Sequence, residues 1–131
     1  MGFRFEFDSV NQILLTKLEG AISDDVIRQL EGALRKQASE KKPLVQIVDC
    51  SGITKFDMSS ELVRHLGKRK PPAYALQARR LIIAPTPVSF GLARMYQMAG
   101  EPQHASVTIV RSMKEALSEL GIEQVKFEPL K

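Results

Sequence analysis

The chain opens on an alternation of apolar and charged residues. Over residues 3–7, three phenylalanines alternate with an arginine and a glutamate, the period-two pattern of a half-buried β-strand. Turn-forming residues occupy 8–11, and the apolar run from Ile13 to Leu18 predicts a second strand. The two segments predict an antiparallel hairpin with a short loop, from which residues 20–22 lead away.

Four later segments repeat apolar residues at steps of three and four, the spacing of an amphipathic helix. Side chains that cap helix N-termini mark the expected starts, which are Ser23, Asp57, Thr86 and Ser112. Residues that stop helices mark the expected ends, which are Pro43, Gly67, Gly100 and Gly121.

The nearly continuous apolar run at residues 44–48 is typical of a strand buried on both faces. Residues 80–84 predict another buried strand, and residues 107–110 predict a last strand. A hairpin followed by alternating helices and strands predicts an α/β fold, with a mixed sheet, an N-terminal antiparallel hairpin and crossover helices. The 131 residues fit a single domain over 1–131. The tail, residues 122–131, carries three apolar side chains, so it either packs back on the domain or extends to a partner.

Composition fits a globular protein of a reducing compartment. Hydrophobic residues make up 44% of the chain and charged residues 26%, which excludes a disordered chain. Cys50 is the single cysteine, so no internal disulfide forms. No stretch resembles a signal peptide or is apolar for long enough to cross a bilayer, and we therefore expect a cytoplasmic protein.

The chain has a net charge of +4, and basic residues form three short runs, at residues 41–42, 68–70 and 79–80. Such runs attract nucleic acid or an anionic membrane, but they are also common at the solvated ends of helices and strands. Aromatic residues make up only 6% of the chain and tryptophan is missing, so few rings are available to stack on bases. We expect no nucleic-acid partner.

Metal and cofactor signals are weak. His65 and His104 are far apart in sequence and lack the neighbouring carboxylates or thiolates of a metal site. Gly52 is a lone glycine, whereas phosphate-binding loops need several. We therefore expect no metal and no cofactor.

Catalysis has candidates but no motif. Cys50 and the serines at 51, 59 and 60 are potential nucleophiles, with His65 as the base, but no nucleophile-elbow sequence is present. Asp49 and Asp57 would be an acid–base pair, although aspartates beside a turn usually cap backbone N–H groups. We expect no catalytic residues and no enzyme.

The stretch DCSGITKFDMSS, residues 49–60, reads as a strand-to-helix turn. With Asp57 as the N-cap, Met58, Ser59 and Ser60 would occupy the first helical turn. A phosphate on a hydroxyl there would meet free N–H groups and the positive end of the helix dipole. Serines are also common in first turns because they cap, and the pattern leaves both interpretations open.

The order and spacing of these segments resemble the STAS domain family of bacteria, the sulfate-transporter and anti-sigma-factor-antagonist module. The resemblance covers about residues 12–121. It is carried by ILLTKLEGAIS, by VDCSGITKFDMSS with the family's Asp-x-Ser-Gly pattern, by GLARMYQMAGE and by VRSMKEALSEL.

The resemblance implies a binding switch. Stand-alone STAS proteins commonly engage a kinase-like anti-sigma factor or another STAS protein until a serine is phosphorylated. That serine typically follows the second aspartate of the motif. Here Met58 holds that position and cannot accept phosphate, and Ser60 stands in place of a glycine.

The sequence is compatible with three functions. The first is a non-enzymatic, regulatory protein-interaction module, with a homodimer as one assembly. Its surface would be formed by Asp57, Ser59, Ser60, Glu61 and Arg64, with His65 beside them. The second is a small-ligand or lipid-binding carrier, with a cavity beneath the helix that starts at Thr86. The third is an enzyme that uses Asp49, Asp57 or a serine.

Overall fold

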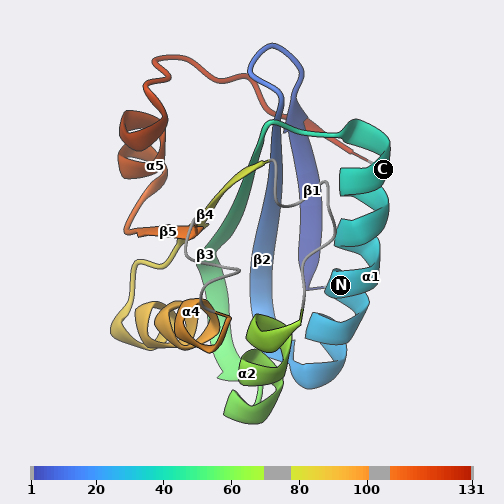
Figure 1. Cartoon of the computed structure of the whole chain (residues 1–131), viewed down its shortest axis with the longest axis vertical. Coiled ribbons are helices and arrows are strands. Elements are labelled where there is room, and N and C mark those ends of the chain that lie inside the picture. The colour runs from blue at the N-terminus through green and yellow to red at the C-terminus, as the bar shows by residue number, and fades with distance from the viewer. Residues whose placement is uncertain (1, 70–77, 101–106, 131) are drawn as a thin grey trace.

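The computed structural model describes residues 2–69, 78–100 and 107–130. Within these residues six strands form one sheet in the order β5-β4-β3-β2-β1-β6 (Figure 1). Strands β2 to β5 run parallel, and β1 runs antiparallel to both of its neighbours. The predicted α/β fold with an N-terminal hairpin, a mixed sheet and crossover helices is confirmed.

The described elements follow one another along the chain as predicted, apart from an extra strand in the tail. The strands are β1 (Phe3–Asp8), β2 (Ile13–Ser23), β3 (Val45–Asp57), β4 (Arg79–Ile83), β5 (Val107–Val110) and β6 (Glu128–Pro129). The helices are α1 (Asp24–Lys41), α2 (Ser60–Lys68), α4 (Pro87–Ala99) and α5 (Met113–Leu120).

Strand β2 is longer than the apolar run that predicted it. It pairs with β1 from Ile13 to Leu18 and then continues beside β3 to Ser23, so the prediction that residues 20–22 leave the hairpin is wrong. The register between β2 and β3 shifts at Gly20. The φ of Gly20 is +78°, a conformation that residues with a side chain disfavour, so glycine allows the strand to continue through this shift. The predicted cap is confirmed, since the Ser23 side chain accepts a hydrogen bond from the N–H of Val26.

Strand β3 runs through most of the stretch that was expected to turn. It pairs with β2 in parallel as far as Asp57, so the strand-to-helix turn expected over residues 49–60 is wrong up to Asp57. Two register shifts give β3 one extra residue each relative to β2, and such bulges let turn-type residues remain in a strand. A Cβ on Gly52 would lie 2.9 Å from the carbonyl oxygen of Leu18, so only glycine fits where the strands approach.

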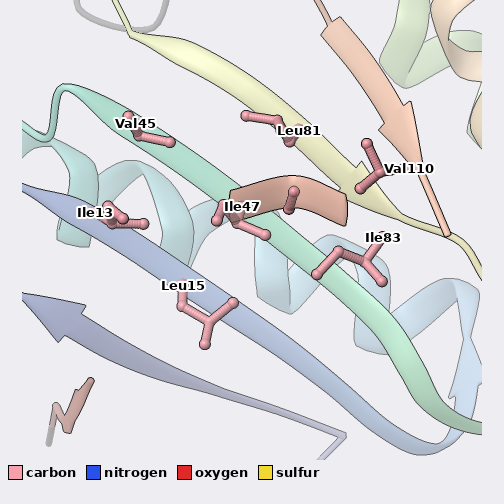
Figure 2. Close-up of a cluster of buried hydrophobic side chains, with 8 residues drawn as sticks. Ile13, Leu15, Val45, Ile47, Leu81, Ile83 and Val110 are labelled. Carbon is pink, nitrogen blue, oxygen red and sulfur yellow. The ribbon is translucent and has the colours of Figure 1, made fainter. Parts of the chain in front are cut away.

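Alternate residues of the central strands face two separate apolar clusters. One contains Ile13, Leu15, Val45, Ile47, Leu81 and Ile83, and Figure 2 shows it across β2, β3 and β4. Helix α5 and the tail cover this side. The opposite cluster joins the sheet to α1 and to α2. The sheet is therefore covered on both faces, as parallel strands require.

Helices α2 and α4 lie in direct contact on the second face. Gly67 is buried inside α2, one residue before its end, so the prediction that Gly67 caps the helix is wrong. A Cβ there would lie 2.5 Å from the carbonyl oxygen of Tyr96 in α4. The glycine therefore serves helix packing. The predicted starts at Thr86 and Ser112 and the predicted ends at Gly100 and Gly121 are confirmed.

The tail packs back on the domain. Glu128 and Pro129 pair with β1, and the N–H of Leu130 donates to the carbonyl of Phe5. Val125 and Phe127 pack against the cluster beneath α5. Of the two alternatives for this segment, the structure has the packed one.

Candidate functional site

The start of α2 lies beside the start of α1, because β2 and β3 run parallel and end together. Ser23 and Asp57 are register partners, and a helix follows each strand end (Figure 1). A carboxylate oxygen of Asp24 accepts a hydrogen bond of 2.6 Å from the N–H of Ser59. This bond holds the pKa of Asp24 below its ordinary value. This hydrogen bond therefore connects the two helix starts at the carboxyl edge of the sheet.

Ser59, not Asp57, caps α2. The Ser59 hydroxyl accepts a hydrogen bond of 3.1 Å from the N–H of Leu62, whereas Asp57 is the last residue of β3. The Asp57 carboxylate is exposed and lies 3.6 Å from the ammonium group of Lys55. The predicted cap was wrong because β3 is longer than its apolar run, which moves the start of the helix by two residues.

The five predicted site residues lie together at this helix start. Asp57, Ser59, Ser60, Glu61 and Arg64 are all exposed, and His65 is exposed beside them. Glu61 and Arg64 are three residues apart on one face of α2, which makes them surface neighbours. The arrangement presents hydroxyls and charges of both signs to solvent.

We expect the substitution Ser59→Ala to destabilise the protein by about 1 kcal/mol, because it removes the N-cap of α2. The matched change Asp57→Ala should alter stability by less than about 0.5 kcal/mol, because it removes only an exposed ion pair. Urea unfolding of the two variants checks this. A larger loss of stability for Asp57→Ala than for Ser59→Ala would indicate that Asp57, and not Ser59, caps α2.

Met58 points away from the surface formed by its neighbours. Its side chain is partly buried and packs against the apolar cluster beneath α1. The residue at the usual phosphorylation position of the resembled family thus has an apolar packing role here.

The two aspartates considered as an acid–base pair, Asp49 and Asp57, do not converge. Asp49 is buried and accepts a hydrogen bond from the N–H of Ser51, whereas Asp57 lies eight residues further along the same strand, more than about 20 Å away. Burial, with a smaller effect of the Asp49 carboxylate, raises the pKa of Cys50 to about 12, so its thiolate is not populated at neutral pH. No nucleophile–base pair is formed by these residues.

No group of three or more metal-binding side chains occurs in the described part of the chain. Of the two histidines, His65 is on α2, and His104 lies outside the described residues. Within the described ranges, no helix has both the length and the apolar character needed to span a membrane.

A cavity of about 290 Å³ lies on the second face of the sheet, between α1, α2 and α4. Its described lining is mostly aliphatic and includes Leu92, Ala93 and Tyr96 of the predicted carrier helix. Gln46 of β3 also lines it, and this residue was missed from the sequence. The only sequence signal was a single polar residue within the apolar run 44–48.

Comparisons with known proteins point to one fold. No family model and no curated protein matches the chain. Among solved structures, a serine-to-glutamate variant of RsbS from Moorella thermoacetica matches with a TM-score of 0.60 at 14% identity, over 92% of this chain and 96% of that chain. RsbS is a STAS-domain anti-sigma factor antagonist. The chain therefore has the STAS fold that its sequence pattern indicated.

Proposed function

We propose that the chain is a non-enzymatic regulatory protein-interaction module of the anti-sigma-factor-antagonist type. The observation that carries this proposal is the shared fold with RsbS over 92% of the chain. The exposed start of α2 supports it, because Glu61 and Arg64 offer charges of both signs on one face of the helix. The separation of Asp49 from Asp57 and the protonated state of Cys50 argue against catalysis.

The partner class follows from the same fold. We propose a kinase-like anti-sigma factor or another STAS protein in the cytoplasm, with a second copy of this chain as a further partner and no role for nucleic acid. Met58 removes the usual phosphate acceptor and packs inward. The proposed binding surface therefore consists of Asp57, Ser59, Ser60, Glu61 and Arg64, without a phosphorylation switch at residue 58.

Capture from the native cells, followed by titration of the purified partner, tests the proposal. We expect recovery of a kinase-like ATPase or a STAS protein, and at least tenfold weaker binding to the variant Arg64→Glu. Lys36→Glu, a charge reversal at an exposed position of α1, serves as the control and should bind as the wild type does. Equal losses in the two variants, or capture of no protein, would contradict the proposed surface.

The second candidate function is a small-ligand or lipid-binding carrier. The aliphatic cavity beneath α4 favours it, since small-molecule sites are typically concave and apolar with a few polar groups. The two functions use different sides of α2. Val63 and Leu66 line the cavity, whereas Glu61 and Arg64 are exposed.

A further inference from the structure

The cavity has aliphatic walls contributed by three helices and the sheet. Side chains from α1, β3, α2 and α4 form these walls, among them Leu30, Leu34, Val48, Val63, Leu66 and Leu92. Such walls favour an apolar ligand body, because its transfer from water is favourable without any directed contact.

Gln46 is the exception on the floor of the cavity. Only 8% of the residue is exposed. In the part of the chain that the structure describes, its Nε2 has no hydrogen-bond partner. Buried amide donors are nearly always paired, because an unpaired one loses its hydration without compensation. An acceptor atom on a ligand would satisfy this donor.

Arginine residues are frequent in the described lining of the cavity around Gln46. Gln46 is the register partner of Arg80 on β4, and Arg80 also hydrogen-bonds to the Tyr96 hydroxyl. Arg35 and Arg69 line the same cavity, and the carboxylate of Glu31 pairs with Arg69. The described lining residues thus include three arginines and one acidic residue, Glu31. Guanidinium groups match the planar, two-oxygen geometry of a carboxylate ligand.

We propose that this cavity binds a small amphiphilic carboxylate. A carboxylate oxygen accepts the Gln46 amide N–H within the positive field of Arg35 and Arg80, and the apolar body lies among the aliphatic walls. With about 30 Å³ for each water-sized unit, a volume of 290 Å³ holds roughly ten non-hydrogen atoms. Octanoate has this size. The inference rests on the carrier function and is independent of partner docking.

Titration calorimetry of the full chain with three eight-carbon probes tests the head group. We expect octanoate to bind with a Kd below about 1 mM, within the range for a ligand of this size. Octylamine, of the same length and opposite charge, should bind at least tenfold more weakly, and so should octanol. Octanol binding as tightly as octanoate would overturn the carboxylate while leaving a carrier. Binding of none of the three would overturn the carboxylate and the carrier together.

The substitution Gln46→Leu separates a ligand contact from a structural role. We expect octanoate to bind at least tenfold more weakly to this variant, and the urea midpoint of the free protein to rise, because a buried donor without a partner is removed. A lower midpoint would show that Gln46 serves the fold, and would overturn its assignment as a ligand contact.

A pair of adjacent charges on α1 tests the positive field. Arg35→Met should weaken octanoate binding at least threefold, because Arg35 lines the cavity. Lys36→Met removes the same charge at an exposed position outside the cavity and should leave binding unchanged. Equal effects of the two substitutions on octanoate binding would contradict a specific contribution of the Arg35 charge to binding.

Discussion

Alanine at position 67 is expected to destabilise the protein by about 2 kcal/mol, although alanine is the better helix former. The new Cβ would lie 2.5 Å from the carbonyl oxygen of Tyr96 and 3.0 Å from the Cβ of Ala99. A backbone oxygen within a helix cannot rotate away, so α2 and α4 must separate, and overpacking of this kind typically costs about 1–3 kcal/mol. Urea unfolding with an unchanged m-value would measure the loss.

Gly32→Ala provides the matched control for this prediction. Gly32 also lies inside a helix, α1, but a Cβ there would meet no atom within 4 Å. Its replacement should stabilise the protein by about 0.5–1 kcal/mol through helix propensity alone. If both substitutions stabilised the protein, the close approach of α2 to α4 would be wrong.

Helix α2 connects the two proposed functions, which gives the Gly67 contact a wider consequence. The inner side chains of α2, Val63 and Leu66, line the cavity, and its outer residues, Glu61 and Arg64, form the proposed docking surface. Displacement of α2 by a side chain at position 67 would change both. We therefore expect Gly67→Ala to weaken octanoate binding and partner binding together, whereas Gly32→Ala should affect neither.

Local signals predicted most of the fold. The caps at Ser23, Thr86 and Ser112 and the stops at Gly100 and Gly121 depend on neighbours within one helical turn, so the sequence alone reveals them. The apolar runs identified the strands of the central sheet for a similar reason. A buried strand is made of apolar residues, and this composition is visible in the strand's own sequence.

Features that depend on a distant segment were not predictable in this way. Gly52 and Gly67 look like turn and stop residues, but Leu18 and Tyr96 decide their roles. The length of β3 depends on its pairing with β2, which hid the cap at Ser59. Gln46 could be recognised as polar, whereas the absence of a described partner for its Nε2 depends on the helices that pack over it.

Asp8→Ala is expected to cause the largest loss, about 3 kcal/mol. Asp8 is 1% exposed, and its carboxylate accepts hydrogen bonds from the N–H groups of Val10, Asn11 and Lys126 and from the Asn11 side chain. It therefore joins the hairpin turn to the tail. Alanine would remove bonds to a charged acceptor and leave donors unpaired, each of which costs about 1–3 kcal/mol. Hydrogen exchange of residues 125–130 should rise together with the loss in urea unfolding.

The loss of stability at acid pH should also depend on Asp8. Burial alone would raise the pKa of Asp8, but the hydrogen bonds from Asn11, Lys126 and Val10 outweigh it and hold the pKa below its ordinary value. A carboxylate with a lowered pKa stabilises the fold above about pH 4, the unfolded value, and this contribution disappears as the pH falls through the folded pKa. In Asp8→Asn, which cannot ionise, stability should fall less steeply below pH 4 than in the wild type. Asp25→Ala, at an exposed position of α1, should keep the wild-type slope. An unchanged slope in Asp8→Asn would mean that other carboxylates set the acid limit of this fold, and that the tail is held chiefly by its apolar side chains.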